Sequence, residues 1–160
     1  MLSILSIISA LWMGALVSIG GLVIPLLFKI LDKTLAGRIA GEIFINLNIF
    51  GLGAGLIIMM LLNQAVKSSG KELFSSEITN HVRKCKNYAL YMILFVILTN
   101  LITYVIYNVK NNPNFILTSK ITPEIFKILH NFSSAIYGIL TLLSIILYIH
   151  ISKLLQNNYR

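Results

Sequence analysis

Four long apolar runs without a charged residue constrain this chain more than any other feature of its sequence. The runs cover residues 2–28, 43–66, 87–109 and 128–149, and the shortest of them holds 22 residues. A helix of about 20 apolar residues spans the roughly 30 Å of hydrocarbon in a bilayer. Backbone N–H and C=O groups find no water there, so a single segment satisfies them only as a helix. We therefore predict four transmembrane helices, at about 2–28, 40–66, 87–109 and 124–151.

The composition indicates a membrane protein with a single domain. Hydrophobic residues make up 57% of the chain and charged residues 11%, whereas soluble domains hold about 45–50% and 25%. A soluble core of this size cannot hide that excess, so lipid must solvate it. We predict an all-α fold, one integral membrane four-helix bundle over residues 1–160. A secretory signal is the alternative for the first run, which however lacks a basic start and is too long.

Thirteen Lys and Arg residues against five Asp and Glu give the chain a net charge of +8. Nearly all of the basic residues lie between the apolar runs, where they meet anionic lipid head groups. We expect membrane lipids as partners, with a second copy of the chain or another membrane protein. We expect no nucleic acid, because a basic face with interleaved aromatics is missing. The basic residues near the helix ends weakly favour an inner-membrane protein with cytoplasmic termini.

Small residues recur at helical spacing in the first two predicted helices. Such residues let helix backbones approach closely in lipid, where the hydrophobic drive between helices is weak. The first helix carries Ala10, Gly14, Ser18 and Gly21, and the second carries Gly37, Gly41, Phe44, Asn48, Gly51 and Gly55. We predict that these two faces pack against each other.

The fourth predicted helix carries a polar stripe on one face. Its members are His130, Ser134, Tyr137, Thr141, Ser144 and Tyr148, spaced alternately four and three apart. Apolar residues fill the rest of the circumference, so we expect the stripe to face the bundle interior. Asn100, Thr103 and Tyr107 of the third helix are the candidate partners.

Two interpretations of this polar stripe stay open. In the first, its side chains hydrogen-bond between helices and to helix backbones, and their role is to hold the bundle together. In the second, His130 lines a site for a small molecule, ion or cofactor together with Asn46, Asn48 and Tyr137. The argument for the second interpretation is that ionisable groups inside a membrane are uncommon and often functional.

The remaining histidines give little sign of a metal or haem site. His81 and Cys85 lie four apart in a predicted basic loop, but two ligands are too few for a structural zinc site. His130 and His150 are separated by 20 residues, which is about 30 Å along a helix. Neither a phosphate-binding loop nor a nucleophile elbow is present. We expect no cofactor and no enzyme activity.

Three motifs resemble one family when they are taken together. They are Leu11-Trp12-Met13-Gly14-Ala15-Leu16, the run from Leu35-Ala36-Gly37-Arg38 through Phe44 to Asn48, and Leu129-His130-Asn131-Phe132-Ser133. In this order they are similar to the uncharacterised bacterial membrane domain that resembles eukaryotic transmembrane protein 205. The resemblance implies a four-helix membrane domain of unestablished role, whose eukaryotic relatives are associated with tolerance of drugs and metal compounds. It implies no catalytic residues, and the positions that match it are Trp12, Gly14, Gly37, Arg38, Asn48, His130 and Ser133.

A more distant resemblance is to the bacterial membrane protoporphyrinogen-oxidase family, which binds haem through a histidine shortly before a Trp-Met-Ala-Gly motif. This chain has Trp12-Met13-Gly14 with no histidine before it. Our leading hypothesis is a non-enzymatic membrane protein for membrane homeostasis or for tolerance of small solutes and compounds. The alternatives are a haem-binding membrane oxidoreductase and a small transporter or channel subunit, which would need a polar pathway.

Overall fold

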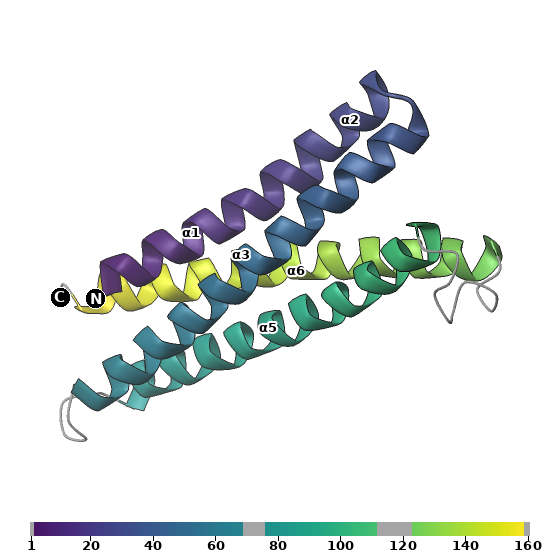
Figure 1. The fold of residues 1–160 in the computed structure, drawn as a ribbon. Helices are drawn as coiled ribbons and strands as arrows, with labels where there is room; N and C mark the ends of the chain where they lie inside the picture. The colour runs from purple at the N-terminus through teal and green to yellow at the C-terminus, as the bar shows by residue number, and fades with distance from the viewer. Residues whose placement is uncertain (1, 69–75, 112–122, 159–160) are drawn as a thin grey trace.

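The computed structural model describes residues 2–68, 76–111 and 123–158 (Figure 1). Its helices, in chain order, are α1 (Leu2–Ser18), the π-helical turn η1 (Ile19–Val23), α2 (Ile24–Ile30), α3 (Lys33–Ser68), α5 (Ser76–Asn111) and α6 (Pro123–Asn158). The described residues contain no strand, which confirms the all-α prediction. Four stretches are long and apolar enough to cross a membrane: Leu2–Ile30, Leu35–Ala65, Thr79–Val109 and Lys127–Gln156. The predicted four-helix membrane bundle is therefore confirmed.

Several helices extend further than the apolar runs predicted. The α3 helix begins at Lys33 and α5 begins at Ser76, seven and eleven residues before the predicted starts. A charge ends an apolar run but not a helix, because Lys and Arg favour helices and their long side chains reach out to water. The prediction that His81 and Cys85 lie in a loop is consequently wrong, since both lie on α5.

A two-residue turn joins α2 to α3 and fixes them as a tight hairpin. The Asp32 carboxylate accepts a hydrogen bond from the Leu35 N–H at 3.0 Å, and the Asp32 carbonyl accepts one from the Ala36 N–H at 2.9 Å. Asp32 is thus the N-cap of α3. At the start of α6, Pro123 and Glu124 occupy the first turn, where a proline and an acidic side chain both suit a helix N-terminus.

Neighbouring helices run antiparallel around the bundle, with α1 between α3 and α6, and α5 on the other side of both. The start of α1 and the end of α6 lie at one end of the molecule (Figure 1). At the opposite end, α2 and the first turns of α3 diverge from the start of α6. We call this divergent end the fork.

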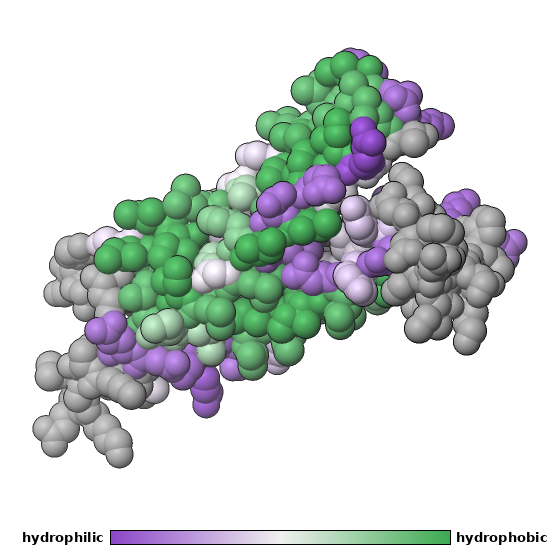
Figure 2. Space-filling model, in the orientation of Figure 1, coloured by the Kyte–Doolittle hydropathy of each residue, from purple (hydrophilic) through white to green (hydrophobic). Residues whose placement is uncertain are grey.

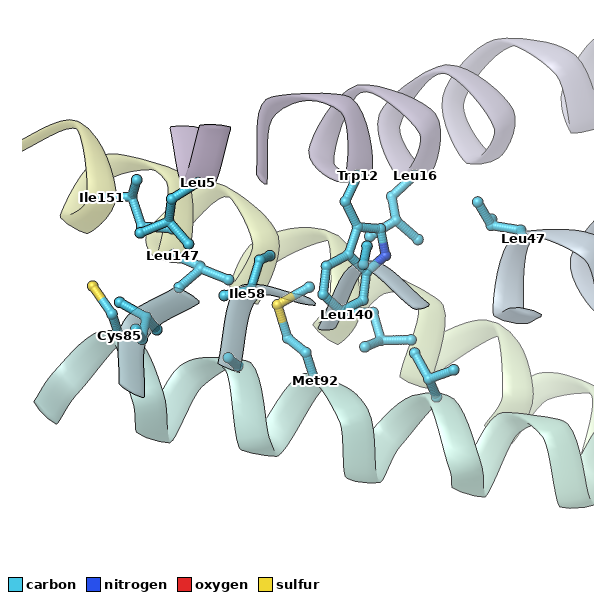
Figure 3. Close-up of a cluster of buried hydrophobic side chains, with 14 of the residues drawn as sticks. Leu5, Trp12, Leu16, Leu47, Ile58, Cys85, Met92, Leu140, Leu147 and Ile151 are labelled. Atoms are coloured by element: carbon cyan, nitrogen blue, oxygen red, sulfur yellow. The ribbon is translucent and has the colours of Figure 1, made fainter. Parts of the chain in front are cut away.

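The centre of the core is built around Trp12, whose side chain is 1% exposed. Its indole points from α1 into the bundle, with Met92 of α5 and Leu140 of α6 close by (Figure 3). A Cβ atom added at Gly51 would lie 3.1 Å from Nε1 of the indole, and one at Gly55 would lie 2.7 Å from Cγ1 of Ile93. Two glycines therefore let α3 approach both Trp12 and α5.

The predicted contact between the two small-residue faces is wrong outside this region. A Cβ atom added at Gly14, Gly21, Gly37 or Gly41 would meet no atom within 4 Å. The face of α1 that is buried carries Leu5, Ser9, Trp12 and Leu16 instead. Large side chains that fill the space between helices bury more surface there than glycine contacts would, and Trp12 takes the place of the expected backbone approach.

Most of the outer surface is apolar, as a lipid-facing surface must be (Figure 2). Large hydrophobic side chains are exposed on every long helix, among them Leu11, Met60, Leu101 and Leu142. A hydrophilic band also runs along the first half of α3, where Arg38, Glu42 and Asn46 are exposed at four-residue spacing.

Candidate functional site

The fork encloses a cavity of about 730 Å³. The apolar walls come from α1, α2 and α3 and include Leu16, Ile24, Phe28, Ala40, Phe44 and Leu47. The cavity lies where α2 leaves the bundle.

One wall of the cavity is polar, and α6 supplies most of it. The polar side chains that line it are His130, Ser133, Ser134, Tyr137 and Thr141 of α6 and Thr103 of α5. These residues include the first four members of the predicted polar stripe. The stripe thus faces the cavity over its first half, and further along the helix Ser144 is buried in the bundle.

Tyr137 joins the cavity wall to the bundle core. Its ring stacks on Phe44 of α3, with centroids 4.2 Å apart and planes inclined by 28°. Its hydroxyl donates a hydrogen bond of 2.8 Å to Oδ1 of Asn48. A phenol stacked on one side and hydrogen-bonded at its tip has little freedom to turn, so this part of the wall is fixed.

Asn48 is the centre of a buried polar network that links three helices. Its Nδ2 donates to Oδ1 of Asn100 at 3.3 Å, and Oγ1 of Thr99 lies 3.3 Å from its Oδ1. Thr99 also lies 2.9 Å from the Val96 carbonyl oxygen, so its one proton has two acceptors. Asn48 is 1% exposed and Thr99 0%. We call Asn48, Thr99, Asn100 and Tyr137 the Asn48 network, which satisfies polar groups that would be costly to bury alone.

Two hydroxyls of the polar wall use their protons within α6. Ser134 donates to the His130 carbonyl oxygen at 3.0 Å, and Thr141 donates to the Tyr137 carbonyl oxygen at 2.9 Å. Each of these two oxygens keeps lone pairs that can accept a further hydrogen bond. Ser134 and Thr141 therefore present hydrogen-bond acceptors to the cavity.

The cavity is closed at its deep end. Below the Asn48 network, the bundle is filled by apolar side chains, including Trp12, Ile58, Met92, Leu140 and Leu147 (Figure 3). Three of these are 0% exposed and the other two 1%. The cavity is thus a blind pocket whose mouth is the fork.

The π-helical turn η1 forms part of the cavity rim. The Ile24 N–H donates to the Ile19 carbonyl, five residues back, and Gly20, Gly21 and Ile24 line the cavity. Pro25 has no N–H for the Gly21 carbonyl, and its ring would collide with that group in a regular α-helix. A widened turn avoids the collision. The π-helical turn is this widened turn.

The other sequence-predicted positions separate into core, cavity and outer surface. Trp12 is in the core, Gly37 lines the cavity, and Gly14 is half-buried in α1 away from it. Arg38 and Asn46 are exposed on the outside of α3, and the Asn46 amide donates to the Glu42 carbonyl at 2.9 Å. Asn46 therefore does not line the cavity that His130 and Tyr137 share, because positions two apart on a helix point to nearly opposite sides and Asn48 is the one that faces inward.

Two parts of the structure were not foreseen. Thr99 belongs to the Asn48 network, although the polar residues expected from α5 were Asn100, Thr103 and Tyr107; Tyr107 is 46% exposed. His81 and His150 are neighbours, with Nδ1 atoms 3.4 Å apart. The basic residues around His81 led to the prediction of a loop instead of a helix. No local sequence pattern relates His81 to His150, because the two residues are far apart in the chain.

The fold and the cavity define a four-helix membrane protein with a blind, partly polar pocket between its diverging helices. The family model described as Domain of unknown function (DUF4149) matches residues 7–112, which is more than half of the chain, and the chain belongs to this family. No curated protein and no solved structure matches the chain itself. The matched range includes Trp12, Asn48 and Thr99 but ends before α6, so His130 and Tyr137 lie outside it.

Proposed function

We propose that this membrane protein binds one amphipathic, lipid-soluble molecule in the fork cavity, and that its role is binding rather than catalysis. The observation that carries the proposal is a cavity of about 730 Å³ with apolar walls on three sides and a polar wall on α6. Ligand pockets of roughly 300–1,000 Å³ with a few convergent polar groups are typical of small-molecule sites.

The polar wall indicates the chemistry of the ligand. Ser134 and Thr141 donate their protons within α6, and Tyr137 donates to Asn48, so these three oxygens remain as acceptors. A ligand with hydroxyl, amide or ammonium donors on one side matches this wall. Its apolar body would lie against Phe28, Phe44 and neighbouring aliphatic side chains. His130, the one imidazole on this wall, would act as a donor or an acceptor according to its tautomer.

The shape of the cavity favours binding over conduction. A channel or transporter needs a polar pathway or a site that opens alternately to both sides. The deep end of this cavity is filled by the apolar core around Trp12. The mouth lies between helices that face lipid, so a molecule dissolved in the bilayer can enter from the side.

A binding role of this kind fits membrane homeostasis or tolerance of lipid-soluble compounds at the inner membrane. The resemblance to the domain similar to transmembrane protein 205, with its association with compound tolerance, supports this part of the proposal. Exposed Lys29, Lys33 and Arg38 near the α2–α3 turn provide positive charge where anionic lipid head groups lie. A second copy of the chain or another membrane protein would meet the exposed apolar helix faces.

Native mass spectrometry of protein extracted in a mild detergent tests the proposal. Gly41 lines the cavity and has open space at its Cβ position, so Gly41→Leu fills the cavity without a clash. Gly53→Leu is the matched control, because Gly53 is exposed on the same helix and has equal space. We expect one discrete amphipathic adduct on the wild type and on Gly53→Leu, and its loss from Gly41→Leu. A wild type with no discrete adduct, or an adduct retained by Gly41→Leu, would contradict the proposal.

A further inference from the structure

Two histidines meet at the end of the molecule opposite the fork. His81 lies near the start of α5 and His150 near the end of α6, and their Nδ1 atoms are 3.4 Å apart. The ring centroids are separated by 5.6 Å and the planes are inclined by 50°. Both side chains are half-buried, so they are held by packing and still reach the surface.

The surroundings hold one imidazole in place and leave the pair near water. The Tyr88 ring, two turns after His81 on α5, stacks on His150 with centroids 5.4 Å apart and planes inclined by 23°. Lys84 and Lys153 are exposed on the adjoining turns of α5 and α6. Exposed ammonium groups at this level indicate the head-group region, so an ion from the aqueous phase can reach the pair.

We propose that His81 and His150 bind a first-row transition metal ion, with Zn²⁺ as the best fit, through their Nδ1 atoms. Zinc holds histidine nitrogens at about 2.0–2.1 Å and prefers a tetrahedral arrangement, which places two ligand nitrogens about 3.3–3.4 Å apart. In the structure the two Nδ1 atoms are 3.4 Å apart and share a hydrogen bond. With the ring centroids 5.6 Å apart, the two nitrogens point nearly straight at each other. Binding of the ion therefore releases the shared proton and turns both rings so that their lone pairs converge on the metal.

Water completes the coordination in this proposal. Among the described residues, no group of three or more His, Cys, Asp or Glu side chains is placed to hold a metal ion. Cys85, one turn after His81, is 0% exposed and packed in the apolar core. The second protein ligand is therefore His150 and not Cys85. Two protein ligands with open positions make an exchangeable site rather than a closed structural one.

A metal ion bound by the His81–His150 pair would link α5 to α6. The chain connects α5 to α6 at the fork end, between Asn111 and Pro123, so the His81–His150 end of this helix pair has no covalent link. A bound ion would tie that end together and stabilise the folded state. The site is independent of the fork cavity, because His130 and His150 are about 30 Å apart along α6.

Cobalt spectroscopy on the full chain, purified without a polyhistidine tag, tests the site. Co²⁺ in a tetrahedral site absorbs strongly in the visible range, while octahedral Co²⁺ absorbs weakly. We expect wild-type protein in detergent to develop a saturable, strong band with one Co²⁺ per chain, which Zn²⁺ then abolishes. A wild type that develops no strong band overturns the proposal without any need for a variant.

Variants then locate the ligands. His81→Ala and His150→Ala should each lose the cobalt band and the rise in melting temperature that Zn²⁺ gives to the wild type. Gln156→Ala is the control, because it changes an exposed polar residue of the same helix outside the pair and outside the fork cavity, and it should keep both. A band that persists in His150→Ala, or disappears in Gln156→Ala, overturns the assignment. Helix content measured by circular dichroism shows that each variant is folded.

Discussion

The hydroxyl of Tyr137 donates a 2.8 Å hydrogen bond to Oδ1 of Asn48, and this bond joins the wall of the fork cavity to the buried core. The two residues come from α6 and α3, whose first turns diverge at the fork (Figure 1). Tyr137 lines the cavity and Asn48 is 1% exposed, so the bond lies between the open fork and the closed bundle. We expect the stability of the bundle and the shape of the cavity to depend on it.

Asn48→Leu should destabilise the protein by about 1–3 kcal/mol, because Thr99, Asn100 and Tyr137 each lose a buried side-chain partner. A single hydrogen bond between membrane helices averages about 0.6 kcal/mol, so the expected loss exceeds that of one bond. Reversible unfolding in mixed micelles with increasing sodium dodecyl sulfate measures it. Asn46→Leu, on the exposed side of the same helix, should change stability by less than about 0.5 kcal/mol. Equal effects of the two variants would contradict the network.

Gly51→Leu should destabilise the protein by about 1–3 kcal/mol through overpacking. A Cβ atom at Gly51 already meets the Trp12 indole at 3.1 Å, and the indole is 1% exposed in the packed core. Gly53→Leu carries the same change of residue on the same helix but faces outward. The same unfolding assay should find the control within about 0.5 kcal/mol of the wild type. A tolerated Gly51→Leu would show that Trp12 does not occupy this contact.

Tyr137→Phe should weaken ligand binding while it keeps the aromatic stack on Phe44. The change removes one acceptor from the polar wall and the hydrogen bond to Asn48, at a cost in stability of about 0.5–1.5 kcal/mol. Wild type and variant compete for a limiting amount of the co-purified molecule, and native mass spectrometry of the mixture gives their relative affinities. Tyr91→Phe, at a position 50% exposed on α5, is the control and should bind as the wild type does. An unchanged affinity of Tyr137→Phe would show that the Tyr137 hydroxyl does not take part in ligand binding.

The number and order of the membrane helices could be predicted from the sequence, because hydropathy over about 20 residues responds directly to the thickness of the bilayer. The polar stripe on α6 could also be predicted, because helical periodicity places His130, Tyr137 and Thr141 on one face. Asn48 was also recognised as a residue of interest. Its neighbour Asn46 was grouped with it although a helix turns them to opposite sides.

The parts that could not be predicted depend on contacts between distant residues. The pairing of His81 with His150 requires the register of α5 against α6, which side-chain packing fixes and periodicity does not. The place of Trp12 depends on Gly51 and Gly55 of another helix. The fork itself follows from the π-helical turn near Pro25 and from the tight α2–α3 hairpin, so no single motif encodes it.

Fluorescence of Trp12, the one tryptophan in the chain, tests the central claim of a ligand-binding fork cavity most directly. The indole is buried from bulk lipid, and Leu16, one turn further along α1, lines the cavity. A brominated amphiphile that enters the cavity would come close enough to quench it. In vesicles that contain phospholipid brominated on its acyl chains, we predict strong quenching for the wild type and Gly53→Leu, and markedly weaker quenching for Gly41→Leu. Equal quenching in all three proteins would contradict occupancy of the cavity.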